Sequence, residues 1–177
     1  MRIKILTWPE SPNGFDQHGL ALILLALPTD TSRVDARRLA REVLQKTAAR
    51  LMRTAKIKII ETPSGPAIAD GGLHISLSYA ADKALIGLSC ERSLGVDIVR
   101  IEHLPEIDAL TRLYLPTPHT ISPADFALAW ARLEACCKAL GLPLAEIDED
   151  RQKAYAACDL PQCTQIDGYR MAVALAP

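Results

Sequence analysis

The stretch SPADFALAWARLEACCKALG, residues 122–141, decides how the rest of this chain is interpreted. Ser122 is typical of a residue that caps a helix, Pro123 suits the first helical turn, and Gly141 favours a helix end. Apolar residues recur between them at alternating spacings of four and three, which places them on one face: Phe126, Trp130, Leu133, Cys137 and Leu140. We therefore predict one long helix that packs against a core.

Two charged residues of this helix, Glu134 and Lys138, lie four positions apart and share a neighbouring face. A surface salt bridge is the ordinary interpretation of such a pair. The stretch SLGVDI, residues 93–98, favours a different one, because it places Asp97 inside an apolar run typical of a buried strand. A buried carboxylate needs a compensating partner, and a magnesium ion held between Asp97 and Glu134 would supply it.

The sequence GVDI at residues 95–98 and the pattern W-x-x-x-E-x-x-x-K-A that begins at Trp130 together resemble the signature of the 4'-phosphopantetheinyl transferases. The likeness is to the single-chain, two-half type that is related to holo-acyl-carrier-protein synthase. It implies a magnesium-dependent enzyme that transfers the 4'-phosphopantetheine arm of coenzyme A to a serine of an acyl or peptidyl carrier protein. It also implies that Asp97 and Glu134 bind the metal, that Lys138 binds a phosphate of coenzyme A, and that all three are catalytic.

Two other interpretations stay open. The chain could be a relative that binds coenzyme A or a carrier domain without transfer, or an α+β domain whose motifs match by coincidence. Fatty-acid, polyketide and nonribosomal-peptide pathways all use serine-bearing carriers, and the sequence does not choose among them.

A second long helix is predicted at residues 32–52, with Val34 and Leu44 on its apolar face. Arginines crowd its first half, where a cation gains nothing from the helix dipole, so they indicate either a bound anion or ordinary surface charge. The resemblance implies that an arginine early in this helix binds coenzyme A. Arg37 is the best match by position, and Arg38 and Arg41 are the alternatives.

The stretch LHISLSY, residues 73–79, alternates as a strand does and places His74, Ser76 and Ser78 on one face. It resembles the strand that ends in Ser-His-Ser in the family, which implies that Ser76 and Ser78 contact coenzyme A. The family histidine is Leu77 here, and Leu133 stands where the family has a lysine before the catalytic glutamate. Arg132 is a candidate to compensate for the second change.

A further departure concerns the loop predicted at residues 62–72, where Ser64-Gly65-Pro66 stands in place of the family's Gly-Lys-Pro. Past Asp97, Val99 stands where one branch of the family has a second metal-binding glutamate, and Glu102 is interpreted as surface charge. The remaining expectations are strands at residues 1–8, 20–27, 56–61, 84–89, 94–98, 155–158, 163–166 and 169–175, with a hairpin turn at residues 90–93 and a short helix at 105–114.

These elements predict an α+β fold with a pseudo-two-fold arrangement of two similar halves in one compact unit. Each half is expected to be a small, mainly antiparallel sheet packed against a long helix. Residues 1–85 would form the coenzyme A side, and residues 86–177 the side with the metal and the catalytic helix.

Composition excludes several classes of partner. A net charge of -1 gives no support for nucleic-acid or membrane binding, and the longest apolar run, residues 20–27, is too short to span a bilayer. The start, MRIKILTW, lacks the apolar centre of a secretory signal, and five cysteines without a metal-type spacing indicate free thiols. We expect a cytoplasmic monomer.

Overall fold

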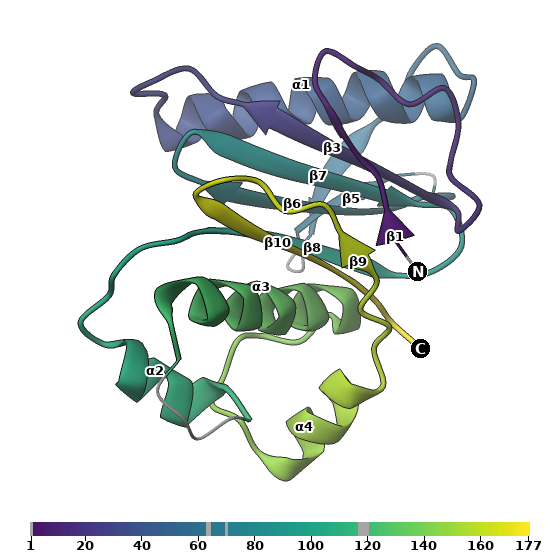
Figure 1. The fold of residues 1–177 in the computed structure, drawn as a ribbon. Helices are drawn as coiled ribbons and strands as arrows, with labels where there is room; N and C mark the ends of the chain where they lie inside the picture. Colours follow the sequence, from purple (N-terminus) through teal and green to yellow (C-terminus); the bar gives the residue numbers. More distant parts are fainter. Residues whose placement is uncertain (1, 63–64, 70, 117–120) are drawn as a thin grey trace.

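The computed structural model has an α+β architecture and describes residues 2–62, 65–69, 71–116 and 121–177. Met1 of the predicted first strand and positions 63, 64 and 70 of the predicted loop lie outside the described residues, as do residues 117–120. Figure 1 shows the layers: α1 (Arg33–Leu51) lies above the central sheet, the pair β8 and β10 lies below it, and α3 (Pro123–Leu140) covers that pair.

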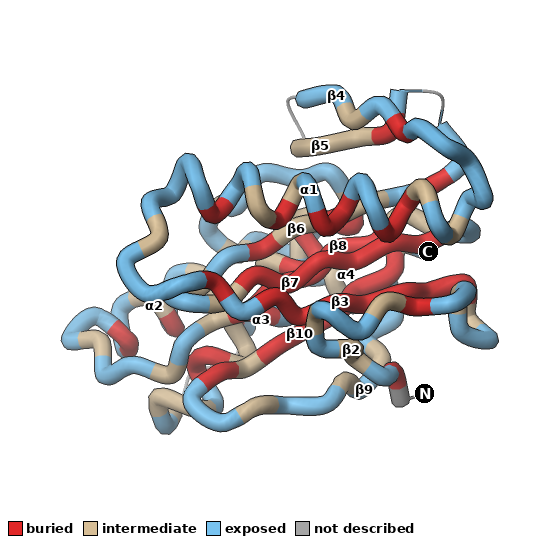
Figure 2. The backbone as a smooth tube through the Cα atoms, turned by 90° about the horizontal axis from the view of Figure 1, so that it is seen from above, coloured by how far each residue is buried: buried red, intermediate tan, exposed pale blue. Residues whose placement is uncertain are grey.

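The α1 side contains a four-stranded sheet in the order β2-β3-β7-β6. Its strands are β2 (Ile5–Thr7), β3 (Leu20–Ala26), β7 (Lys83–Ser89) and β6 (His74–Ala80). β2 runs parallel to β3, and the other two pairings are antiparallel. Figure 2 shows that the central strands are buried along their length, whereas α1 is buried along one face only.

The α1 helix begins as predicted, because the Ser32 side chain caps it by accepting the N–H of Asp35. The prediction that Val34 lies on the apolar face of this helix is wrong. Val34 is 76% exposed, since it lies in the first turn and the residues that meet the sheet begin at Ala36 and continue through Ala40 and Leu44.

The α3 side contains β8 (Leu94–Arg100) and β10 (Tyr169–Leu175), which form an antiparallel pair. The predicted hairpin between residues 84–89 and 94–98 is therefore wrong. β7 has no free edge to offer β8, because it pairs with β3 on one side and β6 on the other. β8 instead lies against the other face of the central sheet, and their side chains share one apolar cluster.

The α3 helix has the predicted bounds, with Ser122 as its N-cap and Gly141 at its end in the left-handed conformation. Leu140 packs on the β10 side, but the rest of the predicted apolar stripe does not face the sheet. Phe126, Leu133 and Cys137 pack with residues of α2 (Ile107–Tyr114) instead. The face that meets β8 and β10 is a stripe of small side chains: Ala131, Ala135 and Ala139.

Gly95 allows this close packing of α3 on β8. A Cβ atom at position 95 would lie 1.9 Å from the carbonyl oxygen of Ala135 and 2.7 Å from the backbone nitrogen of Ala139. Any side chain there would push the helix away from the strand. The backbone of α3 consequently lies nearer to β8 than larger interface residues would permit.

Three further predictions need correction. Within the predicted loop, β5 (Gly65–Ile68) pairs with β4 (Ile59–Thr62) as a hairpin. The predicted strand at residues 155–158 is the end of α4 (Glu149–Ala156), which Asp148 caps. The predicted strand at residues 163–166 is the shorter β9 (Gln162–Cys163).

Contacts between the ends of the chain join the two sides. β9 pairs in parallel with β1 (Arg2–Ile3), and the two lie side by side near the termini in Figure 1. The boundary expected at residue 85 falls inside β7, whose partners β3 and β6 both belong to the α1 side. Among the described residues, no helix combines the length and the apolar character needed to cross a membrane.

Candidate functional site

Asp97 is the buried acid at the centre of the candidate site, with 3% of its surface exposed. The Ser78 hydroxyl donates a hydrogen bond of 2.6 Å to its Oδ1, and the Lys138 ammonium donates a second one of the same length. Strand β8 supplies the acid, β6 the serine and α3 the lysine. The three residues meet because β8 lies between β6 and the close-packed helix.

Two effects oppose each other at the Asp97 carboxyl. Burial raises the pKa of Asp97 to about 6, helped by the nearby negative charge of Glu134. The Lys138 charge and the hydrogen bonds from Lys138 and Ser78 lower that pKa, but burial has the larger effect. Asp97 is thus ionised at neutral pH and takes up a proton in mild acid.

Glu134 is the second acid, and its neighbours along α3 hold it in place. The Trp130 indole N–H donates a 2.8 Å hydrogen bond to Glu134 Oε1, and Lys138 Nζ lies 3.7 Å from Oε2. The Trp130 ring packs against the rings of Phe126 and Tyr114, each with a centroid separation of 5.5 Å. The carboxylate therefore has a fixed direction along the helix.

Lys138 joins the two acids. Its Nζ lies 2.6 Å from Asp97 Oδ1 and 3.7 Å from Glu134 Oε2, and it also donates to the carbonyl of Val96 at 3.1 Å. The two predicted metal ligands thus approach one point in space. That point is occupied by an ammonium group, which compensates the buried charge that the sequence analysis assigned to magnesium.

The fit of a magnesium ion can be judged from this donor set. Both acids offer hard oxygen atoms, as magnesium prefers, and it commonly completes its shell with water and substrate phosphate. No cluster of three or more His, Cys, Asp or Glu side chains suited to a metal occurs among the described residues. Asp97 and Glu134 could hold the ion if Lys138 Nζ moved off Asp97. The two hydrogen bonds that the Asp97 carboxylate accepts, from Ser78 and from Lys138, both end on Oδ1 in the described chain.

A pocket of about 530 Å³ opens beside the acids, and we call it the arginine pocket. It brings together four of the predicted site residues from three elements: Arg37 of α1, Ser78 of β6, and Glu134 and Lys138 of α3. The rest of its wall consists of Leu27, Thr31, Arg33, Ala36, Leu77, Tyr79 and Ala81. Of these, Leu77 was singled out from the sequence, as the position of the family histidine.

The structure separates Arg37 from its two alternatives. Arg38 forms ion pairs with Asp35 and Glu42, and Arg41 forms one with Glu61 on β4. Arg37 has no ion pair with any described residue, and it lines the arginine pocket. Arg37 is therefore the arginine of α1 that is placed to bind an anion there.

Ser76 has a different position from Ser78. Its hydroxyl accepts the Val96 N–H at 3.0 Å, and it is absent from the wall of the arginine pocket. Ser78 makes the equivalent contact with the Ile98 N–H at 3.3 Å and reaches Asp97 in addition. Ser76 thus connects β6 to β8, whereas Ser78 also belongs to the site.

At the positions where this chain departs from the resembled family pattern, the residues present do not supply the polar or charged groups of that pattern. Leu133 is 6% exposed and packs toward α2, so it lies away from Asp97. Arg132 lines a different pocket with residues near β9, and it does not compensate as suggested. Ser64 lies outside the described residues, while Gly65 and Pro66 belong to β5.

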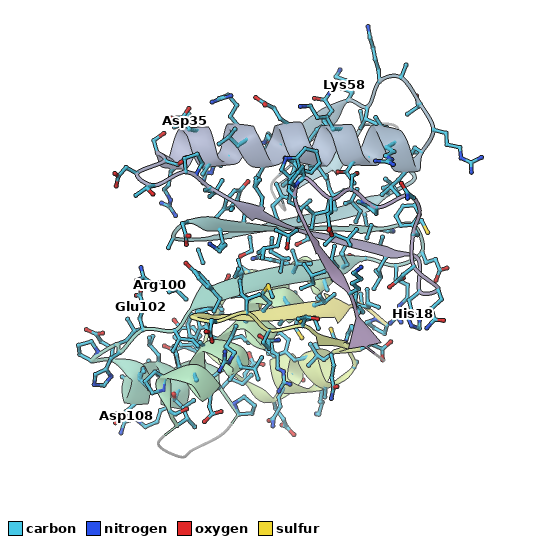
Figure 3. The ribbon with its side chains drawn as sticks, turned by 45° about the horizontal axis from the view of Figure 1, so that its top comes forward. His18, Asp35, Lys58, Arg100, Glu102 and Asp108 are labelled. Carbon is cyan, nitrogen blue, oxygen red and sulfur yellow. The ribbon has the colours of Figure 1, made fainter. Side chains whose placement is uncertain are left out.

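Glu102 is a surface residue, as expected. It forms a 3.4 Å ion pair with Arg100, and Figure 3 shows both labelled side chains where the chain leaves the end of β8. The contact that the sequence analysis missed is the one from Trp130 to Glu134. Their spacing of four on one helix was the available signal.

Comparisons with known proteins do not place the chain in a family. A scan against protein-family models gives no match, and a search of curated proteins gives none either.

Proposed function

We propose that this protein transfers the 4'-phosphopantetheine arm of coenzyme A to a serine of an acyl or peptidyl carrier protein. The observation that supports it best is the approach of Asp97 and Glu134 to one ammonium group beside a pocket lined by Arg37. A pyrophosphate brings negative charge, and this pocket contains fixed cations next to two potential metal ligands.

In the proposed reaction, the carrier serine oxygen forms a bond to the phosphorus that bears pantetheine, and the pyrophosphate bond breaks to release 3',5'-ADP. Phosphoryl transfer depends mainly on positioning and on neutralising charge. Magnesium, when bound by Asp97 and Glu134, supplies a positive charge that stabilises the phosphate oxygens. Lys138 and Arg37 add positive charge around the same group.

The serine must also lose a proton. Glu134 is the acid that faces the arginine pocket, whereas Asp97 lies beneath it. Trp130 fixes Oε1 of Glu134, so Oε2 is the oxygen that would accept the proton, directly or through water.

The arrangement of the fold agrees with this proposal in outline. One long helix covers each side, α1 on the central sheet and α3 on the pair β8 and β10, and the arginine pocket lies between the two helices. We propose that these are the two related halves of the transferase fold, and that the protein works as a cytoplasmic monomer.

The decisive experiment incubates the protein with coenzyme A, magnesium and an apo carrier protein, and measures the mass of the carrier. We expect a mass gain equal to the phosphopantetheine arm, and loss of this gain in Asp97→Ala and Glu134→Ala. Glu102→Gln is the matched control, because it changes an exposed acid outside the pocket. No mass gain with carriers from all three pathways would contradict the proposal.

A second candidate is a relative that binds coenzyme A without transferring its arm. Two observations favour it: Lys138 already occupies the position between the acids, and Leu133 packs toward α2 where the family has a lysine. Coenzyme A that raises the melting temperature without any mass gain on the carrier would support this second function.

A further inference from the structure

A two-residue turn joins β6 to β7 at the wall of the arginine pocket. Ala80 pairs with Lys83, so Ala81 and Asp82 alone form the turn. Ala81 lines the arginine pocket and has a φ angle of 48°, in the left-handed region that alanine seldom adopts. A residue in this conformation keeps its place only when its neighbours hold the backbone there. The contacts of the turn therefore decide how this part of the pocket wall lies.

Asp82 makes contacts in two directions from this turn. Its carbonyl accepts the N–H of Leu27 at 2.8 Å, and Leu27 follows the end of β3 and also lines the arginine pocket. Its carboxylate accepts hydrogen bonds from the Tyr169 hydroxyl and, at 2.5 Å, from Lys83 Nζ. Lys83 Nζ also lies 5.6 Å from the centre of the Tyr169 ring. Asp82 thus connects the turn to the end of β3 and to the start of β10.

Tyr169 is a firm anchor for this connection. It is 8% exposed, and it belongs to the apolar cluster that the central sheet shares with β8 and β10. As the first residue of β10, it pairs with Arg100 of β8, three positions beyond Asp97. A side chain packed in this way has little freedom to move. The Tyr169 hydroxyl therefore ties the β6–β7 turn to the strand pair that carries Asp97.

The protonation states of both groups suit this hydrogen bond. Hydrogen bonds from Lys83 and from Tyr169 lower the pKa of Asp82 to about 2, so its carboxylate is charged at neutral pH. Burial and the hydrogen bond to Asp82 raise the pKa of Tyr169 above its ordinary value, so its hydroxyl keeps the proton. A hydrogen bond from a neutral donor to a charged acceptor is stronger than one between neutral groups. The contact is thus present throughout the pH range of an ordinary assay.

The arginine pocket has walls from both sides of the molecule. Arg37 and Ala81 belong to the α1 side, whereas Glu134 and Lys138 belong to α3. Phosphoryl transfer requires groups on both walls to meet one phosphate in a fixed geometry, and a misplacement of about 1 Å can greatly reduce the rate. A contact that fixes one wall relative to the other therefore affects the rate more than the affinity for the ligand.

We infer that Asp82 and Tyr169 are positioning residues for the transfer, which hold the α1-side wall of the arginine pocket in place relative to α3. This inference rests on the proposed function. Neither residue is part of the pocket wall. They act through Ala81, the neighbour of Asp82 in the turn, and through Leu27, whose N–H the Asp82 carbonyl accepts.

The test measures kcat and the KM for coenzyme A of the full chain in the carrier-mass assay. Tyr169→Phe removes only the hydroxyl, and we expect it to lower kcat about tenfold while the KM changes less than about twofold. Tyr155→Phe is the matched control, because its hydroxyl contacts Cys137 and Arg151 and it does not line the arginine pocket. A purely structural role would give the two variants similar losses of melting temperature and similar kcat values.

Substitutions of Asp82 repeat the test at an exposed position, even if Tyr169→Phe does not fold. Asp82→Ala removes the acceptor, whereas Asp82→Asn keeps an oxygen that accepts the Tyr169 hydroxyl. We expect Asp82→Ala to match the kcat loss of Tyr169→Phe, and Asp82→Asn to retain more of the wild-type kcat. The double variant Asp82→Ala with Tyr169→Phe should lose no more than either single variant, because each removes the same hydrogen bond.

The outcomes separate the two proposals. If the wild type transfers the arm and Tyr169→Phe has the same kcat as Tyr155→Phe, the positioning inference is wrong while the proposed function stands. The inference is also wrong if the loss appears in the KM for coenzyme A with kcat unchanged, because Asp82 and Tyr169 would then affect binding. If the wild type transfers nothing to any carrier, the proposed function fails and this inference fails with it.

Discussion

The two long helices pack on their strands in different ways. α1 meets the central sheet through Ala36, Ala40, Val43 and Leu44, so side chains of mixed size fill the interface. α3 meets β8 through small residues opposite Gly95, and its backbone lies against the strand. The site depends on the close packing of α3 on β8, because this packing lets Lys138 of α3 reach Asp97 of β8.

The largest expected effect comes from removing the close approach. Gly95→Ala places a Cβ atom where the carbonyl of Ala135 lies, and backbone cannot move aside as a flexible side chain can. We expect a loss of about 3 kcal/mol or more of unfolding free energy, measured by urea denaturation.

Gly14→Ala is the control for this variant, because nothing lies within 4 Å of a Cβ atom at Gly14. An equal, small loss in both variants would mean that α3 tolerates displacement, and the contrast between the two helices would no longer hold.

The second prediction compares acids on the two sides. Burial raises the pKa of Asp97 from 3.8 to about 6, so the folded protein binds its proton more tightly than the unfolded chain. Its stabilising contribution is full below pH 4 and is lost as the pH rises through 6. Relative to Asp97→Asn, the wild type should lose about 3 kcal/mol of unfolding free energy across this window.

The opposite sign is expected for the exposed Asp35 at the start of α1. Hydrogen bonds from Ser32 and Arg38 lower the pKa of this carboxyl below 3.8, so its contribution is present at neutral pH and is lost in acid. Denaturation at a series of pH values measures both variants. Parallel pH profiles for Asp97→Asn and Asp35→Asn would contradict the assigned burial of Asp97.

The third prediction concerns the two tryptophans of the chain, one on each side. Trp130→Phe keeps a ring between Tyr114 and Phe126 but removes the N–H that holds Glu134. If the proposed transfer occurs, kcat/KM should fall about tenfold, which corresponds to one lost hydrogen bond to a charged group.

Trp8→Phe is the control, because Trp8 packs against the α1 core. Among the described residues, its backbone N–H bonds to the carbonyl of Leu24, which is not a site residue. Equal activity losses in the two variants, or a large drop in melting temperature for Trp130→Phe alone, would indicate a packing role instead.

The smallest expected effect concerns the N-caps of α1 and α3, which are alike. Ser32 and Ser122 each accept the N–H of an aspartate three residues later, at 3.1 Å in both caps. Ser32→Ala and Ser122→Ala should each lower the unfolding free energy by about 1 kcal/mol. A clearly greater loss for Ser122→Ala would show that the closely packed helix also depends more on its cap.

The sequence predicted what local chemistry determines. The caps of α3 and the strand at Asp97 followed from residue type and spacing, whereas the approach of Asp97 and Glu134 to one site was implied by the resemblance of the two motifs. Pairing between distant strands did not follow, because β8 has an apolar pattern that fits β7 as well as β10. The strand predicted at residues 155–158 overlaps the end of α4, because Asp148 caps a helix that begins upstream of it.

The identity of the cation beside Asp97 was equally beyond the sequence. A buried acid indicates that some positive group or donor lies near it, and both Lys138 and a metal satisfy that requirement. The stripe Ala131, Ala135 and Ala139 was overlooked because small residues contribute little to an apolar pattern, although they define the face that meets β8. Gly95 was the signal for this contact.

The pairing of β1 with β9 affects the order in which the molecule can be completed. Arg2–Ile3 is synthesised well before its partner Gln162–Cys163. β1 must therefore wait without this partner while the central sheet forms around β3 and β7. We expect nascent chains that stop before β9 to leave β1 open to proteases, and chains that include β9 to protect it.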